Sequence, residues 1–404
     1  MFDSIYTGLT GLSTFSRGLS NISGNVANLN TVGYKRSVLQ FQDLLSTQSG
    51  FGGGSGTGNG VGAGQPHLVY TEGELRKTGN DLDAAVDGAG YFVLQDNAGK
   101  TVYTRDGQFE FDKDSKLVTR DAKDKVMLVD ANGALSAFDL APYRILAGTP
   151  TTSLRFDGVL STADSDKSHT VGNLTLYDNA GVPHSVSMTF TDQTDPSVTT
   201  AEHVWQYSLG DDKKNVLASG TLRFGVDGSP ATDTVPASFS WKPADGVSQD
   251  IVLDFGSAGK FGGLTSFSVG ADSTARLQVG DGGASGSLTG TTYDADGTIR
   301  LKYSNGETRA AGALALAYFA YPQQLVSEGG ALWTNGGIDQ PVLGKAQSAM
   351  FGAVAGGQVE ASNVDLTAQF SELIVTQRGY QASSQVISTA NEMLQQLFDM
   401  RSRR

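Results

Sequence analysis

Residues 366–398, LTAQFSELIVTQRGYQASSQVISTANEMLQQLF, carry the pattern that decides the fold of this chain. Apolar residues recur every seven positions, and a second series follows the first by four. The first series is Leu366, Leu373, Tyr380, Ile387 and Leu394. The second series is Phe370, Gln377, Ser384, Asn391 and Phe398. This spacing predicts a long helix with a coiled-coil seam, whose start Ser362 or Asn363 can cap.

The outer face of this predicted helix carries almost no charge. Only Glu372, Arg378 and Glu392 are charged between residues 366 and 398. A free coiled coil normally carries many charges outside its seam. We therefore expect the helix to be surrounded by other helices. The other interpretation is a helix docked in the core of its own chain, and the missing charges weaken it.

The N-terminal segment predicts a partner for that helix. Its apolar residues alternate by three and four, with one phase slip between Leu12 and Phe15. They are Ile5, Leu9, Leu12, Phe15, Leu19, Ile22, Val26 and Leu29. Gly8, Gly11 and Gly18 fall on one face, where small residues would allow close approach. Because each interior glycine costs about 1 kcal/mol relative to alanine, we expect a helix that forms only against a partner.

Between the two ends the hydrophobic period changes to two, which is typical of strands. All ten prolines lie between Pro66 and Pro341. Residues 102–111 predict a hairpin around Asp106-Gly107, and residues 174–190 predict another around 179–181. We found no alternation of strands and helices that would indicate a parallel α/β core. The predicted fold class is mainly β outer domains plus an α-helical coiled coil formed by the N- and C-terminal segments.

Composition and motifs argue against several functions. The 404 residues carry a net charge of −13, which disfavours nucleic-acid binding, and no apolar run is long enough to insert in a membrane. The four histidines lack metal-ligand spacing, no G-x-S-x-G occurs, and cysteine is absent. We therefore predict no catalytic, cofactor-binding or metal site, and hence no enzyme. The N-terminus also lacks the features of a cleavable signal peptide.

Four stretches, in order along the chain, resemble signatures of the flagellar rod, hook and hook-associated axial protein family. They are SNISGNVANLNTVGYK at 20–35, TGNDLDAAVDGAGYF at 78–92, YTRDGQF at 103–109, and EASNVDL at 360–366 with QRGYQA at 377–382. The positions assigned to the family motif are Asn25, Ala27, Asn28, Thr31, Gly33, Tyr34, Lys35, Ser362, Asn363, Val364, Asp365, Gln377, Arg378, Tyr380 and Gln381. Together the four stretches bracket nearly the whole chain.

The resemblance implies a domain plan. Residues 1–48 with 362–404 would form the inner helical coiled coil, and residues 49–65 a Gly-rich linker. Residues 66–145 with 296–361 would form an inner β domain, and residues 146–295 an inserted outer β domain. The insert holds 17 acidic and 8 basic residues, so we expect it to face water.

The resemblance also implies a function. The large insert favours a hook-type member, whose copies would assemble into a curved helical tube that acts as a universal joint between rod and filament. Expected partners are further copies of the chain, the distal rod protein, the hook cap, the hook-filament junction proteins and the flagellar export apparatus. Location in the extracellular hook would follow export without a cleaved signal peptide. The alternatives are a distal rod or junction protein of the same family, and an exported β-rich binding protein or enzyme with flagellar-type ends.

Overall fold

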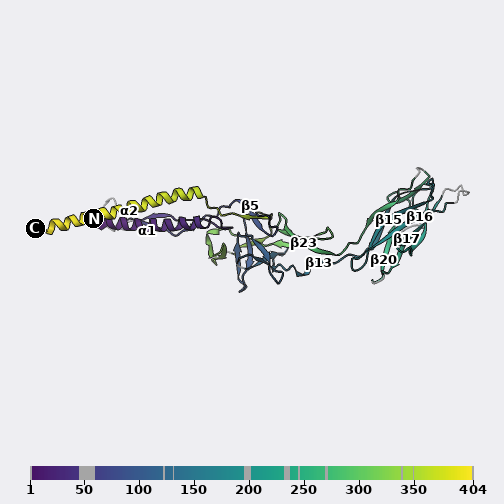
Figure 1. Cartoon of the computed structure of the whole chain (residues 1–404), viewed down its shortest axis with the longest axis horizontal. Coiled ribbons are helices and arrows are strands. Elements are labelled where there is room, and N and C mark those ends of the chain that lie inside the picture. The colour runs from purple at the N-terminus through teal and green to yellow at the C-terminus, as the bar shows by residue number, and fades with distance from the viewer. Residues whose placement is uncertain are drawn as a thin grey trace. The chain divides into compact units, whose positions relative to one another are not determined.

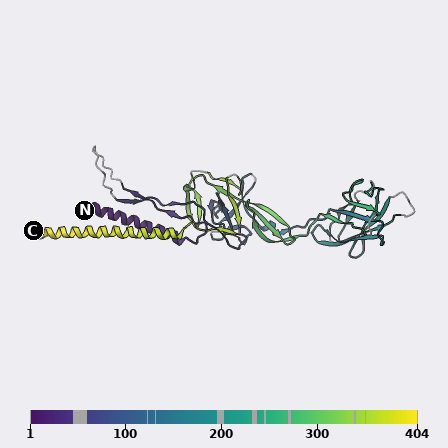
Figure 2. The ribbon, with the colours of Figure 1, turned by 90° about the horizontal axis from the view of Figure 1, so that it is seen from above.

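The structure is a computed structural model that describes residues 2–44, 60–121, 123–130, 132–194, 202–231, 237–243, 246–268, 272–337, 340–348 and 350–402. It contains two compact units, shown in two views in Figures 1 and 2. Unit 1 comprises Met1–Ala141, Gly290–Leu301 and Arg309–Arg404, and unit 2 comprises Pro142–Thr289 and Lys302–Thr308. Most of the predicted linker, residues 49–59, lies outside the described residues. The predicted boundaries at 146 and 295 stay a prediction; residues 290–295 lie in unit 1.

Helices α1 (Phe2–Ala27) and α2 (Leu366–Ser402) pack against each other in unit 1 (Figure 1). They are antiparallel, because Gly8 lies beside Ile387 whereas Gly18 lies beside Thr376. The cap predicted for α2 is wrong. Asp365 is the N-cap residue, since its Oδ1 accepts the backbone N–H groups of Thr367 at 2.8 Å and Ala368 at 3.2 Å.

Glycine residues form much of the α1 surface that meets α2. A Cβ atom at Gly8 would lie 2.8 Å from Cγ1 of Ile387, and one at Gly11 would lie 2.7 Å from Oγ of Ser383. The predicted close approach of the helices is therefore confirmed. The inward positions of α1 run without a break in steps of three and four: Gly8, Gly11, Phe15, Gly18, Ile22 and Asn25. The predicted phase slip is wrong, because it came from counting only apolar side chains; Leu9 is in fact exposed.

On α2, the seam toward α1 differs from the predicted one in its second series. Positions four residues after each member of the first series face away from α1, so that Phe370 and Phe398 are exposed. Positions three residues after each member of the first series face α1 instead. These positions are Gln369, Thr376, Ser383 and Ala390. Small and polar side chains fill this series because they sit opposite the glycines and Asn25 of α1, where the backbones come close.

A narrow ribbon of short strands packs on α1. It consists of β1 (Ser37–Val38) with β4 (His67–Leu68) and β2 (Phe41–Asp43) with β3 (Val61–Ala63). The Thr14 hydroxyl donates to the Val61 carbonyl at 3.1 Å, and the Phe15 and Phe41 rings meet edge to face. Residues 60–65 of the predicted linker thus belong in part to a strand.

The β part of unit 1 is a sheet with short flanking pairs. Its main order is β25-β11-β7-β8-β28-β27, while β9, β10, β12, β26 and β29 attach beside it and β5 and β6 pair with β31 and β30. The bounds of its earlier strands are β5 (Leu75–Lys77), β6 (Ala84–Asp87), β7 (Tyr91–Gln95), β8 (Thr101–Thr104), β9 (Phe109–Phe111), β10 (Leu117–Thr119), β11 (Lys125–Val129) and β12 (Leu135–Ala137). The later strands are β25 (Thr308–Leu314), β26 (Leu316–Tyr318), β27 (Leu325–Gly329), β28 (Leu332–Asn335), β29 (Val342–Gly344), β30 (Ala353–Gly356) and β31 (Gln358–Glu360), with a 3-10 turn η2 (Pro322–Gln324) before β27.

The core of this β part is rich in aromatic residues. Phe319 meets the rings of Tyr91 and Tyr103 edge to face, and Phe92 meets Phe109 in the same way. The hairpin predicted around Asp106-Gly107 is wrong, because β8 pairs with β7 and β28 while β9 pairs with β10. The intervening loop instead approaches the segment that follows α1.

Unit 2 contains two packed sheets. One has the antiparallel order β15-β16-β17-β18, and the other has β19-β20-β14-β21 with β22 beside β14. Their bounds are β14 (Ser153–Ser161), β15 (Ser168–Tyr177), β16 (Pro183–Asp192), β17 (His203–Asp211), β18 (Val216–Phe224), β19 (Ala237–Trp241), β20 (Gln249–Asp254), β21 (Leu264–Phe267) and β22 (Arg276–Gly280). Strand β13 (Ile145–Leu146) also belongs to unit 2, whereas η1 (Ala141–Tyr143), β23 (Gly286–Tyr293) and β24 (Thr298–Tyr303) each contain residues of both units.

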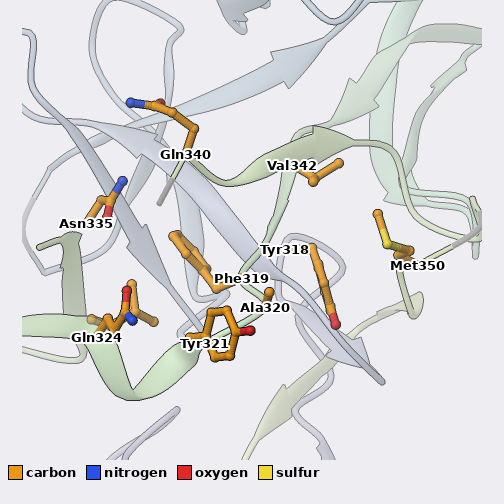
Figure 3. A pocket seen from close by; sticks show the side chains of 10 residues that line it. Tyr318, Phe319, Ala320, Tyr321, Gln324, Asn335, Gln340, Val342 and Met350 are labelled. Carbon is orange, nitrogen blue, oxygen red and sulfur yellow. The ribbon is translucent and has the colours of Figure 1, made fainter. Parts of the chain in front are cut away.

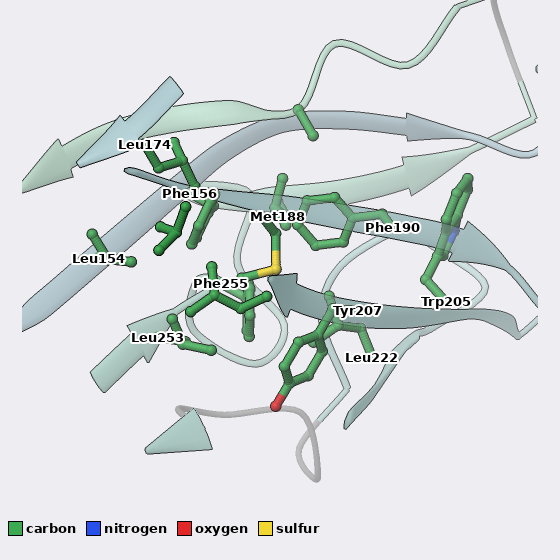
Figure 4. Packing of buried hydrophobic residues seen from close by; sticks show 14 of the residues in the cluster. Leu154, Phe156, Leu174, Met188, Phe190, Trp205, Tyr207, Leu222, Leu253 and Phe255 are labelled. Atoms are coloured by element: carbon green, nitrogen blue, oxygen red, sulfur yellow. The ribbon is translucent and has the colours of Figure 1, made fainter. Parts of the chain in front are cut away.

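Alternating side chains build the core of unit 2. Met188 and Phe190 of β16 point inward beside Trp205 and Tyr207 of β17, and Phe255 completes the cluster (Figure 4). The predicted hairpin at 174–190 is confirmed by the β15–β16 pairing. The predicted fold class is also confirmed, since the described chain is mainly β with a terminal helix pair. Among the described residues, no helix is both long and apolar enough to cross a membrane.

Candidate functional site

Three segments far apart in the sequence meet at one buried carboxylate in unit 1. Lys35, which follows α1, places Nζ 2.5 Å from Oε1 of Glu360, which precedes α2. Arg105, in the loop after β8, places Nη1 3.1 Å from Oε2 of the same residue. The three side chains are between 1% and 6% exposed. This buried triad joins both terminal segments to the sheet.

Further hydrogen bonds offset the cost of burying these charges. The Gly73 N–H donates to Glu360 Oε1 at 2.9 Å, and Lys35 Nζ donates to the Thr71 carbonyl at 2.8 Å. Arg105 donates to backbone carbonyls of β6 and of the turn after it, and its guanidinium lies 5.0 Å from the centre of the Tyr91 ring. Burial lowers the pKa of Lys35, and the Glu360 carboxylate opposes that shift. The triad is therefore almost completely buried and links the two terminal segments by ion pairs.

Asparagine side chains connect the helix pair to the same region. Asn25 of α1 donates to Gln369 Oε1 of α2 at 2.9 Å, and its Oδ1 accepts the Ser37 N–H at 2.9 Å. Asn363 accepts the N–H of Arg36 at 2.7 Å and donates to the Val69 carbonyl at 2.7 Å. Each asparagine thus acts as a bridge between backbone segments, which a hydrophobic residue of the same size could not do.

The structure places the family-motif residues in two groups. The first group lies around the triad and the asparagines, and comprises Asn25, Asn28, Thr31, Gly33, Tyr34, Lys35, Ser362, Asn363, Val364 and Asp365. The second group is exposed on the helices away from it, and comprises Ala27, Gln377, Arg378, Tyr380 and Gln381. Gly33 has φ +69°, and a Cβ there would lie 2.9 Å from the Asp106 nitrogen, so its close approach requires glycine.

The outer surface of the helix pair is apolar to an unusual extent for helices that face water. Large apolar side chains at its exposed positions are Tyr6, Leu9, Leu366, Phe370, Ile374, Val375, Tyr380, Val386, Met393, Leu397, Phe398 and Met400. Of the residues predicted for the assembly helices, Ile22 is buried and Ile5, Leu12, Phe15, Leu19, Val26, Leu29, Leu373, Ile387 and Leu394 are half-buried. Their role between copies stays a prediction. A surface of this kind marks a protein interaction site.

Asp106, beside Gly33, provides a pH-dependent feature of the same region. Burial raises the pKa of Asp106 to about 6, while the Gln108 N–H at 3.0 Å opposes that shift. Neighbouring charges come from Asp83, Asp121 and Arg120. Because the folded state holds the proton more tightly than the unfolded state, this carboxyl favours folding below about pH 4. That contribution is lost as the pH rises from about 4 to about 6.

We expect Asp106→Asn to stabilise unit 1 at pH 7 by about 1–2 kcal/mol, since partial exposure reduces the 1.36 kcal/mol expected per pKa unit. The amide keeps an oxygen that can accept the Gln108 N–H. At pH 4 the variant and the parent protein should unfold at the same urea concentration. Urea unfolding at both pH values checks this, and equal stability at pH 7 would contradict it.

A pocket of 370 Å³ lies elsewhere in the β part of unit 1 (Figure 3). Aromatic, amide and aliphatic side chains line it, including Tyr318, Phe319, Tyr321, Gln324 and Met350. Its described lining residues include no carboxylate, imidazole or amine. The hydroxyls of Tyr318 and Tyr321 are the ionisable groups among these described lining residues.

Comparisons with known proteins agree with the position of the motif residues. Residues 5–35 match the family described as flagella basal body rod protein. Residues 85–133 match the flagellar hook protein FlgE/F/G D1 domain, and residues 355–400 match the flagellar basal body rod FlgEFG protein C-terminal family.

Curated relatives extend the similarity to the whole chain. The flagellar hook protein FlgE of Escherichia coli (strain K12) is 28% identical over 437 residues, which cover 97% of this chain and 98% of that protein. The flagellar hook protein FlgE of Borreliella burgdorferi is 29% identical over 454 residues, which cover 100% of both. This chain is thus similar to flagellar hook proteins over almost its whole length. The large middle region of the chain lies within both alignments.

A solved structure, of Helicobacter pylori flagellar hook protein FlgE2, covers 70% of this chain and 98% of that one, with a TM-score of 0.46 and 12% identity.

Sequence reasoning identified Lys35 as a motif residue but missed the triad itself. Glu360 and Arg105 stand inside matched signatures, yet nothing local marks them as partners. The available signal was the charge of Glu360, which is the one charged residue in the stretch 353–364. A charged residue in such a stretch is buried only when it has a partner of opposite charge.

Proposed function

We propose that this chain is a structural subunit of the bacterial flagellar hook and that it polymerises with itself into a helical tube. The observation that carries the proposal is the exposed apolar surface of the helix pair, in a chain similar to hook proteins from end to end. Burying that surface against further copies would supply the driving force for assembly.

The role that we infer is structural rather than catalytic. The tube is expected to be curved and to act as a universal joint between rod and filament. Its expected partners at the two ends are the distal rod protein and the hook-filament junction proteins, with the hook cap and the export apparatus needed during growth. A rod or junction protein, and an exported enzyme, are less favoured because the relatives named as hook proteins match over nearly their full length.

Phe370→Asp tests the proposal. Phe370 is 50% exposed on α2, so the substitution should leave the single chain folded. In a polymer the new carboxylate would be buried without a partner, which costs several kcal/mol, and polymer yield should fall at least tenfold. Sedimentation with electron microscopy measures the polymer, and circular dichroism checks the fold.

Val216→Asp is the matched control. Val216 is 63% exposed on β18 of unit 2, outside the helix pair, and its change should leave polymer yield within about twofold of the parent protein. Parent-like yield from Phe370→Asp would mean that α2 is not covered by other copies. Failure of the parent protein to form any polymer would contradict the proposed function itself.

A further inference from the structure

The end of α2 extends beyond the described part of α1. Gly11 lies beside Ser383 and Gly18 beside Thr376, so seven residues along one helix match seven along the other. On this register the start of α1 is level with residue 392 of α2. Residues 393–402 therefore extend past α1 by about 15 Å at 1.5 Å per residue. Figures 1 and 2 both show α2 continuing beyond the beginning of α1.

This extension carries an apolar stripe. Met393, Leu397 and Met400 are exposed, and their spacing of four and three places them on one side of the helix. The outer side of α1 carries exposed apolar residues as well, namely Tyr6 and Leu9. Neither set meets the other within the chain, because Leu9 is level with residue 385.

Two isolated charges flank these apolar surfaces. Arg17 is the only cation of α1, and Glu392 is the acid at the beginning of the extension. Both are exposed, and neither has an ion pair or hydrogen bond with another described side chain. Arg17 is level with residue 377, so about 22 Å along the axis separates it from Glu392 of the same chain.

We propose that the extension of α2 docks on the outer side of α1 of a second copy, displaced by about 22 Å along the helix axis, so that Glu392 pairs with Arg17 of that copy. This inference rests on the proposed function. At the same displacement, and because the two helices run antiparallel, Met400 is level with Leu9 of the second copy. One displacement therefore matches the charges and covers the apolar stripe.

The contact also explains how growth continues. It joins one patch, on α2, to a different patch, on α1, and leaves the second copy with its own extension free. Copies placed without displacement would instead set Arg17 level with Arg378, since both lie at the same height along the pair. That arrangement brings like charges together and leaves the apolar stripe in water.

Cysteine cross-linking tests the displacement directly, because the native chain has no cysteine. The variant Arg17→Cys/Glu392→Cys cannot close a disulfide within one chain, where the two positions are too far apart. Oxidation of its polymer should give a ladder of covalent oligomers in a denaturing gel. The control Arg17→Cys/Arg378→Cys should give none. A ladder from the control alone, or from neither variant in a polymer that still forms, would overturn the inference.

A charge exchange provides the second measurement. Glu392→Arg and Arg17→Glu should each raise the concentration needed for polymerisation by about 3- to 10-fold. The double variant Arg17→Glu/Glu392→Arg should return to within about twofold of the parent protein. A double variant worse than either single one would contradict the pair. Failure of the parent protein to polymerise would instead count against the proposed function.

Discussion

Replacing Glu360 by alanine is expected to lower the free energy of unfolding of unit 1 by about 3–5 kcal/mol. The substitution leaves the Lys35 ammonium and the Arg105 guanidinium buried without their shared carboxylate. Both cations are held away from water, and neither has another carboxylate at salt-bridge distance among the described residues. Glu360→Gln should cost less, because one oxygen remains to accept the Gly73 N–H.

Urea unfolding monitored by circular dichroism measures this loss, and hydrogen exchange shows where it occurs. Protection should fall in β6 and β31, beside the triad, and persist in β16 and β17 of unit 2. The matched control is Glu328→Ala, which removes the carboxylate of an exposed ion pair with Lys100 and should cost less than about 1 kcal/mol. If Glu360→Ala lowers the free energy of unfolding no more than this control does, the triad does not stabilise unit 1.

Gly8→Leu is expected to prevent the pairing of α1 with α2 and to reduce polymer yield at least tenfold. A Cβ atom at Gly8 would lie 2.8 Å from Ile387 Cγ1 and 3.3 Å from the backbone oxygen of Ser383. A leucine side chain cannot be accommodated there unless the helices separate. Overpacking of this kind costs about 1–3 kcal/mol, which is large for a helix pair held by few large side chains.

Gly24→Ala is the matched control for that change. No atom lies within 4 Å of a Cβ at Gly24, and alanine favours the helix by about 1 kcal/mol. Its helix content and polymer yield should equal or exceed those of the parent protein. Circular dichroism and sedimentation of both variants make the comparison. Equal behaviour of the two variants would show that the glycines of α1 do not determine helix approach.

The terminal helices could be predicted from sequence because their period is local. In the first heptad series of α2, Leu373, Ile387 and Leu394 are partly covered, whereas Leu366 and Tyr380 are exposed. The second series failed for a physical reason. Where α1 presents glycine, the opposing position needs a small side chain, so Ser383 occupies the seam and Phe370 lies outside. A search that scores only apolar residues therefore selects the positions next to those that face α1.

Strand pairing could likewise be predicted only where the paired strands are neighbours in the sequence. The hairpin of β15 and β16 follows from a turn and the strands adjoining it. The loop at Asp106-Gly107 has the same local appearance, yet β8 finds its second partner in β28, more than two hundred residues later. Gly33 occupies the space beside that loop. Which of two similar turns closes a hairpin is thus decided by distant segments that no local pattern contains.

The contacts that join the two terminal segments link residues far apart in the sequence, and this separation bears on the order of folding. Lys35 and Glu360 are separated by 325 positions, and Asn25 and Gln369 by 344. Closing so long a loop costs entropy before any contact is gained, whereas β15, β16 and β17 of unit 2 each pair with the next strand along the chain. Lys35 cannot pair until the segment that contains Glu360 has come close to it. We therefore expect unit 2 to fold first, and the junction and the helix pair to form in the final step.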